Sequence, residues 1–168
     1  DVSFCSDVAF SPGSNQLAMI VDVGSGNELF VQDLGSLGSA PVRINGPLVA
    51  SGDVTDLAWS PDGRYLAYRA DEDTNGDFEL YLADLSAFPT VSVVKVNRAF
   101  TGSQDVETDF AFTPDSQRLV YRSDEITSGT EDLFVFAVGG TAGSSARVNP
   151  SLFTGDVDSD WALSPDSR

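Results

Sequence analysis

Apolar and polar residues alternate in short runs along this chain, and the runs recur in a fixed order. Four similar segments end in Ser-Pro or Thr-Pro, and their prolines lie about 50 residues apart. The segments are SDVAFSP from Ser6, TDLAWSP from Thr55, TDFAFTP from Thr108 and SDWALSP from Ser159. Self-similarity at a fixed period is the signature of a repeat architecture, in which one supersecondary unit is copied along the chain.

Each unit holds four apolar runs separated by turn residues. In the second unit, the segment TDLAWSP is followed by YLAYRAD from Tyr65, by ELYLADL from Glu79 and by a short run that ends at residues 95–97, Lys-Val-Asn. The runs are rich in residues that favour strands, and Pro-Asp-Gly separates the first two runs of this unit. No stretch sustains a period of 3.6 residues. The sequence therefore predicts an all-β fold.

Four antiparallel strands repeated every ~40–50 residues are typical of the blades of a β-propeller. We expect three four-stranded blades at about 1–52, 53–104 and 105–155, and the first strand of a fourth blade within 156–168. Propellers need about four blades or more to close. We therefore expect these blades to belong to a larger ring, which either the rest of a longer parent chain or further copies of this chain complete.

The motifs SPDGRYLAY from Ser60 and ELYLADL from Glu79 resemble the TolB-type, WD-repeat-like propeller repeats. Such repeats occur in periplasmic TolB, in the propeller domains of prolyl-oligopeptidase-type peptidases and in many secreted bacterial proteins. The resemblance implies a ring of about 6–8 blades and an extracellular or periplasmic location. It is specific for the fold and says little of function, because the repeated residues shape blades and do not bind substrates.

The amino-acid composition narrows the range of functions that this chain can have. The chain has 26 Asp and Glu against 9 Lys and Arg, a formal net charge of −17 and no histidine. The absence of histidine excludes a Ser-His-Asp relay and a His-ligated zinc in this chain, and the charge argues against nucleic acid as a partner. Cys5 is the only cysteine, and no apolar run reaches the roughly 20 residues of a membrane span. We expect no enzymatic activity.

The acidic residues concentrate in particular loops. In a propeller blade, the connections between blades and the loop between the second and third strands emerge on one face. Most of the 26 acidic residues fall in these loops. A face of one charge sign steers partners of the opposite sign. The alternative is that solvated acids simply collect in loops and keep the protein soluble.

One aspartate occupies an equivalent position at the start of each of the four repeated segments. The four residues are Asp7, Asp56, Asp109 and Asp160. We predict that they form an acidic ring at the mouth of the central channel, able to bind a cation or a basic peptide. The alternative is that each carboxylate caps a turn by accepting hydrogen bonds from nearby backbone N–H groups. Arg69 and Arg122 are placed to pair with these acids.

The segment DEDTNGD at residues 71–77 carries oxygen ligands at alternate positions and a glycine at the sixth. This spacing matches the start of a calcium loop, since Ca²⁺ prefers oxygen ligands on a sharp turn. The candidate ligands are Asp71, Asp73, Asn75 and Asp77. The twelfth position, which holds a bidentate Glu in such loops, is Leu82, so an acidic hairpin turn is the alternative.

Taken with the resemblance, these features favour a non-enzymatic propeller scaffold, extracellular or periplasmic. Its acidic loop face would present itself to a protein or glycan partner. One alternative is an accessory propeller domain of a larger secreted enzyme, such as a prolyl-oligopeptidase-type peptidase. Another is a structural subunit whose open ends drive assembly into rings or filaments.

Overall fold

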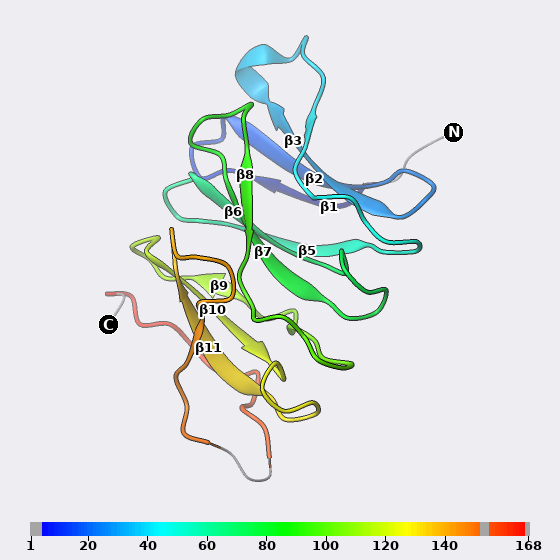
Figure 1. The fold of residues 1–168 in the computed structure, drawn as a ribbon. Coiled ribbons are helices and arrows are strands. Elements are labelled where there is room, and N and C mark those ends of the chain that lie inside the picture. Colours follow the sequence, from blue (N-terminus) through cyan, green and yellow to red (C-terminus); the bar gives the residue numbers. More distant parts are fainter. Residues whose placement is uncertain (1–4, 152–154, 167–168) are drawn as a thin grey trace.

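The computed structural model describes residues 5–151 and 155–166, and these form three four-stranded antiparallel sheets (Figure 1). Blade 1 contains β1 (Cys5–Phe10), β2 (Gln16–Asp22), β3 (Asn27–Asp33) and β4 (Val42–Arg43). Blade 2 contains β5 (Val54–Trp59), β6 (Tyr65–Ala70), β7 (Glu79–Asp84) and β8 (Ser92–Lys95). Blade 3 contains β9 (Ala111–Phe112), β10 (Arg118–Ser123), β11 (Asp132–Ala137) and β12 (Ala146–Arg147). The predicted all-β class and the four-stranded antiparallel blades are confirmed.

The turn between the first two strands explains the Ser-Pro and Thr-Pro repeats. The Ser60 hydroxyl oxygen accepts a hydrogen bond from the backbone N–H of Tyr65 at 2.9 Å, and the N–H of Gly63 donates to the Ser60 carbonyl at 2.8 Å. The φ of Gly63 is +70°, which glycine adopts without strain. The hydroxyls of Ser11 and Thr113 accept equivalent bonds from the second strands of their own blades.

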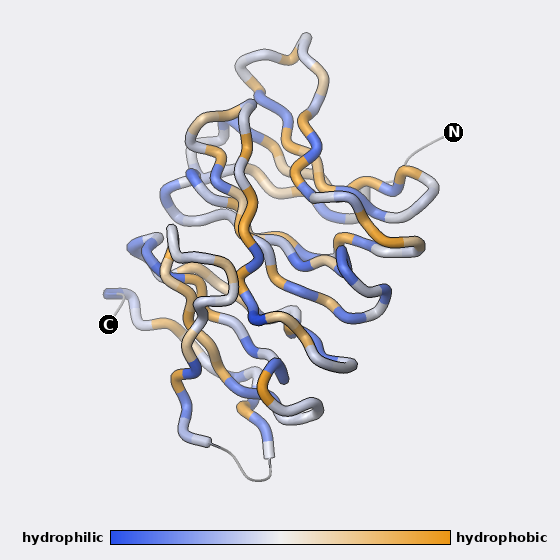
Figure 2. The backbone as a smooth tube through the Cα atoms, in the orientation of Figure 1, coloured by the Kyte–Doolittle hydropathy of each residue, from blue (hydrophilic) through white to orange (hydrophobic). Residues whose placement is uncertain are grey.

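The sheets pack face to face, and the hydrophobic core lies in the layers between them (Figure 2). The first layer joins Ala18, Leu29 and Val31 of blade 1 to Leu66 and Tyr68 of blade 2, and all five are fully buried. The second layer joins the other face of blade 2 to blade 3. Blade 2 is thus buried on both faces, which is why β7 is an almost continuous apolar run and does not alternate.

An asparagine after the fourth strand fixes the third strand in every blade. The side-chain oxygens of Asn45, Asn97 and Asn149 accept hydrogen bonds from backbone N–H groups of Leu29, Leu80 and Leu133 at 2.8, 2.9 and 2.8 Å. Where the short fourth strand ends, the third strand has an N–H group without a ladder partner, and the amide satisfies it. This contact accounts for the repeated basic–β-branched–Asn pattern.

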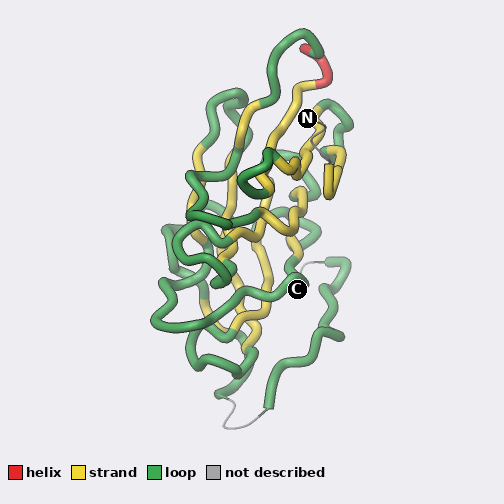
Figure 3. The backbone as a smooth tube through the Cα atoms, turned by 90° about the vertical axis from the view of Figure 1, so that its right-hand side faces the viewer, coloured by secondary structure: helices red, strands yellow, loops and turns green. Residues whose placement is uncertain are grey.

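The first strands of successive blades lie side by side, since β1 contacts β5 and β5 contacts β9. The sheets are stacked along the long dimension of the molecule, and the described part of the C-terminal segment runs beside blade 3 (Figure 3). Residues 155–166, where the first strand of a fourth blade was expected, form no strand, because a strand needs a paired neighbour. Within the described residues, no helix is long and apolar enough to cross a membrane.

We predict that replacing Asn97 with alanine (Asn97→Ala) destabilises the fold by about 1–3 kcal/mol, because the buried N–H of Leu80 then loses its acceptor. The free energy of unfolding, measured in urea, tests this. The exposed Ser92→Ala serves as the control, with an expected change within about 0.5 kcal/mol. Equal stabilities for the two variants would show that the amide contributes nothing.

Candidate functional site

The loop between the second and third strands of each blade lies against the connection to the next blade, and together these segments build the loop face. An aspartate in each connection accepts a hydrogen bond from a backbone N–H at the start of the third strand. The pairs are Asp53 with Asn27 at 2.7 Å, Asp105 with Phe78 at 2.7 Å and Asp156 with Glu131 at 2.9 Å. These contacts hold the two kinds of loop against each other.

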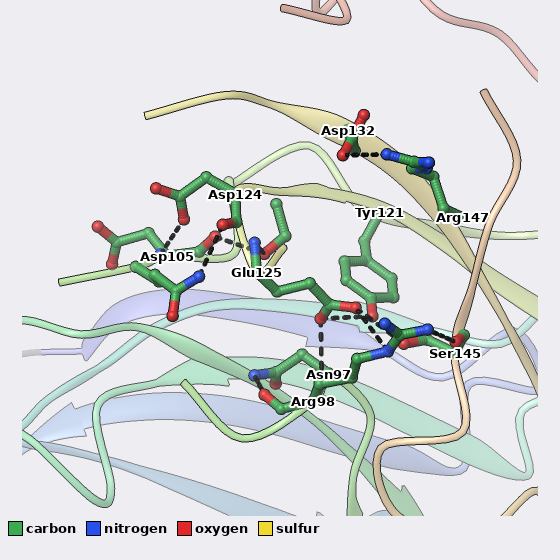
Figure 4. A network of polar contacts seen from close by, with 11 residues as sticks. Asn97, Arg98, Asp105, Tyr121, Asp124, Glu125, Asp132, Ser145 and Arg147 are labelled. Carbon is green, nitrogen blue, oxygen red and sulfur yellow. Dashed lines mark hydrogen bonds and ion pairs between the residues drawn. The ribbon is translucent and has the colours of Figure 1, made fainter. Parts of the chain in front are cut away.

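Two buried aspartates at the end of the second strand tie the same loops together. One oxygen of Asp71 accepts from the N–H of Asp53 at 2.5 Å, and the other accepts from the N–H of Gly76 at 2.8 Å. Asp124 binds the N–H groups of Asp105 and Gly129 in the same way, both at 2.7 Å, and Figure 4 shows Asp124 beside Asp105. Each carboxylate therefore closes its own loop and anchors the preceding connection.

One glutamate of blade 2 and one of blade 3 each accept a backbone hydrogen bond from the preceding blade. Glu72 accepts from the N–H of Gly46 at 2.9 Å and from the Tyr68 hydroxyl at 2.9 Å. Glu125 accepts from the N–H of Arg98 at 3.0 Å and from the Tyr121 hydroxyl at 3.1 Å (Figure 4). Burial raises the pKa of both glutamates, and these hydrogen bonds oppose the rise. We call each contact an interface glutamate bond.

These two interface glutamates were not singled out from the sequence. Their N–H partners lie 26 and 27 residues earlier in the chain, beyond the reach of any local motif. The one signal in the sequence was Tyr four residues before Glu, which recurs in units two and three. In unit one the corresponding residues are Met19 and Val23.

Basic residues of the fourth strand neutralise acids at the start of the third strand. Arg43 pairs with Glu28 at 3.0 Å, and Arg147 pairs with Asp132 at 3.2 Å. In blade 2, the ammonium of Lys95 lies between Glu79 and Asp73. Much of the acidic charge in these loops is therefore paired within the fold.

The four aspartates of the predicted channel-mouth ring have different environments. Asp56 and Asp109 pair with the arginines of their own blades, Arg69 at 3.7 Å and Arg122 at 2.7 Å. Asp109 also accepts from the indole N–H of Trp161 at 2.7 Å. The other two, Asp7 and Asp160, are exposed. Their joint binding of a cation or a basic peptide stays a prediction.

The candidate calcium ligands are engaged in other contacts. Both oxygens of Asp71 accept backbone N–H groups, and Asp73 pairs with Lys95. Asn75 is exposed in the turn, and Asp77 follows it, donating its N–H to the Thr74 carbonyl at 3.1 Å. Over residues 5–151 and 155–166, no group of three or more His, Cys, Asp and Glu residues is arranged to hold a metal ion. The calcium site stays a prediction, and these contacts are those of an acidic hairpin turn.

The model for the WD domain, G-beta repeat family matches residues 42–73, from the last strand of blade 1 through the second strand of blade 2. TolB from Acinetobacter baumannii is similar in structure, with a TM-score of 0.56 and 23% identity over 98% of this chain. The chain therefore has the β-propeller fold, and its repeats resemble the WD-repeat and TolB-type blades. It spans 36% of the length of that TolB chain.

Other propellers share the fold at lower identity. The β-propeller domain of the Trilobed protease from Pyrococcus furiosus has a TM-score of 0.58 and 14% identity, over 89% of this chain and 44% of that one. A prolyl endopeptidase has a TM-score of 0.58 and 13% identity, over 86% of this chain and 22% of its own. Among curated proteins, no sequence match was found.

Two carboxylates, those of Asp109 and Glu131, each have one buried oxygen without a hydrogen-bond partner in the described part of the chain, and Glu131 is the one that lines a cleft. Glu131 lies beside Asp156 and Arg122 in this cleft of about 400 Å³. Burial raises its pKa to about 7, with further contributions from Glu107 and Asp124, while Arg122 opposes the rise. The folded state therefore favours the protonated form of this carboxyl group.

We predict that Asp71→Asn lowers the free energy of unfolding by about 1–2 kcal/mol, because one of its two backbone N–H groups loses its acceptor. The loss should be the same in EDTA and in excess calcium. Urea titrations of parent and variant under both conditions measure it. A calcium-dependent stabilisation of the parent that disappears in the variant would instead establish a calcium site.

We predict that Glu131→Gln raises Tm by about 1–3 °C at pH 8 and leaves it unchanged at pH 4. Because the pKa of Glu131 is about 7 in the folded state against an ordinary value of 4.5, its negative charge reduces stability progressively as pH rises between these values. Thermal unfolding at both pH values measures the difference. The exposed Asp160→Asn is the control, and a Tm gain that is equal at the two pH values would contradict the assignment.

Proposed function

We propose that these blades form a non-enzymatic scaffold, extracellular or periplasmic, whose acidic loop face binds a protein partner with a basic surface. The propeller fold supplies the scaffold. The observation that carries the proposal is the set of carboxylates left over after the internal pairs are counted. Within the described residues, the side chains of Asp77, Glu107 and Asp160 make no hydrogen bond or ion pair, although the charge of Glu107 acts at longer range on Arg69 and Arg122.

Part of the left-over charge lies near a cleft that suits a basic side chain, since Glu107 acts electrostatically on Glu131 of the cleft and Asp160 follows its lining residue Ser159. Glu131, Asp156 and Asp158 line the cleft of about 400 Å³, and Arg122 is its only cationic lining residue among those described. A Lys or Arg side chain entering this cleft would meet the buried oxygen of Glu131 that has no partner. Such a contact would be charge-assisted and partly shielded from water, which strengthens it.

The same fold is compatible with two other functions. The blades would equally serve as the accessory propeller of a larger secreted enzyme, as the likeness to a prolyl endopeptidase illustrates at the level of fold. A self-assembling subunit is the third proposal, and a mass that rises with concentration would identify it. A protein partner is favoured over a neutral glycan, because unpaired carboxylates at a cleft attract cations.

We predict that a short oligolysine peptide binds this chain and that Asp158→Asn with Asp160→Asn weakens binding by about threefold to tenfold. Both aspartates are exposed on the loop face. The matched control is Ala87→Lys with Ala142→Lys, which changes net charge equally at exposed turns of the opposite face. Titration calorimetry at low salt measures the affinities.

The two pairs of variants separate a loop-face site from attraction to the overall charge. A site predicts that only the loop-face pair weakens binding. Equal weakening by both pairs would show attraction to net charge alone, and binding of a neutral oligosaccharide in place of the peptide would replace the protein partner with a glycan.

A further inference from the structure

Blade 3 has an uncovered groove on the face that points away from blade 2. The groove has a volume of about 540 Å³ and lies between the sheet and the C-terminal segment. Its apolar lining comes from Val120, Leu133, Val135, Val148, Trp161 and Leu163. Val148 is 53% exposed, whereas its equivalent in blade 2, Val96, is fully buried.

The same surface on blade 2 shows what fills such a groove. Ala67, Leu80 and Leu82, the equivalents of Val120, Leu133 and Val135, are buried in one cluster with Leu119 and Tyr121 of blade 3. Both of these side chains come from β10, the second strand of the following blade. The groove on blade 3 therefore presents the same kind of surface that forms the interface between blades 1 and 2 and between blades 2 and 3.

The C-terminal segment already sits where the next blade would start. The guanidinium of Arg122 donates to the Val157 carbonyl at 2.8 Å, as that of Arg69 donates to the Val106 carbonyl at the start of blade 3 at 2.6 Å. The indole N–H of Trp161 is bound to Asp109 of blade 3. The C-terminal segment thus forms the inner wall of the groove, and the position that the second strand of a following blade would occupy is uncovered.

One contact of the two internal interfaces cannot form at this third one. Each interface glutamate accepts from the N–H of the residue that follows the asparagine after the fourth strand, which is Gly46 in blade 1 and Arg98 in blade 2. In blade 3 the residue after Asn149 is Pro150, which has no N–H. A glutamate brought to this position would be buried without its backbone donor, which is costly.

We propose that the groove on blade 3 docks the second strand of a further propeller blade, and that this blade carries an apolar residue where blades 2 and 3 carry the interface glutamate. Blade 1 shows such a variant, since Val23 stands at this position and is 41% exposed. The rule is specific to this junction, because Pro150 is the residue that removes the donor.

A four-blade chain tests the proposal directly. Residues 165–168, Pro-Asp-Ser-Arg, correspond to Pro-Asp-Gly-Arg at residues 61–64, so a copy of residues 65–97 appended after Arg168 supplies the second, third and fourth strands of a further blade. Two versions differ only in the copied interface residue, which is either Glu or Val. With Trp59→Phe in the parent and in both versions, Trp161 is the only tryptophan and its fluorescence reports docking, while urea unfolding reports stability.

We expect Trp161 emission to shift to shorter wavelength in both extended chains. The Val version should unfold at a urea concentration about 0.5 M or more above that of the Glu version. In the original chain, Glu72→Val should lower the urea midpoint, because Gly46 loses its acceptor. The same substitution thus has opposite signs at the two junctions.

Restoring the donor completes the test. With Pro150→Gly in both extended chains, the advantage of the Val version should shrink by at least half, while any general effect of the glycine cancels between them. An unchanged Trp161 spectrum in both extended chains would overturn the docking site. A Glu version at least as stable as the Val version, with Pro150 present, would overturn the residue rule.

Discussion

The arrangement of these blades depends on carboxylates that accept backbone N–H groups where strands meet loops. Because each blade packs against neighbours, the N–H groups at these edges are shielded from water and need acceptors from the protein. Asp53, Asp71 and Glu72 provide them at the junction of blades 1 and 2. Charge-assisted bonds of this kind are roughly twice as strong as neutral ones. Acidic loops are therefore first a structural requirement of the repeat.

This requirement explains how far the sequence could be interpreted. The period, the Ser-Pro turns and the apolar runs act within one unit, so they predicted the class, the strands and the turns. The interface glutamates act between units, and their partners are backbone N–H groups, which have no side-chain signature. The equivalence of Asp56 and Asp7 in sequence did not carry over to their environments, because only units two and three supply an arginine from the second strand.

The difference between a local sequence pattern and the contacts formed in the fold also applies to the candidate calcium loop at residues 71–77. Its spacing of oxygen atoms is that of a calcium loop, but spacing alone does not show which donors the oxygens already serve. Asp71 and Asp124 hold equivalent places and bind equivalent N–H groups, although only the first is followed by the calcium-like pattern. A feature shared by two repeats is better explained by what the repeat needs than by a ligand that one copy would hold.

The carboxylates that make no hydrogen bond or ion pair within the described residues lie on loops that other acidic residues hold in place. The loops that carry Asp77 and Glu107 are fixed by Asp105, which binds the N–H of Phe78, and by Asp124, which binds the N–H of Asp105. Loops already ordered lose little conformational entropy when a partner binds, so a given contact yields more affinity. Under the proposed function, the paired acids contribute to recognition indirectly, because they hold the loops that carry the remaining carboxylates in place.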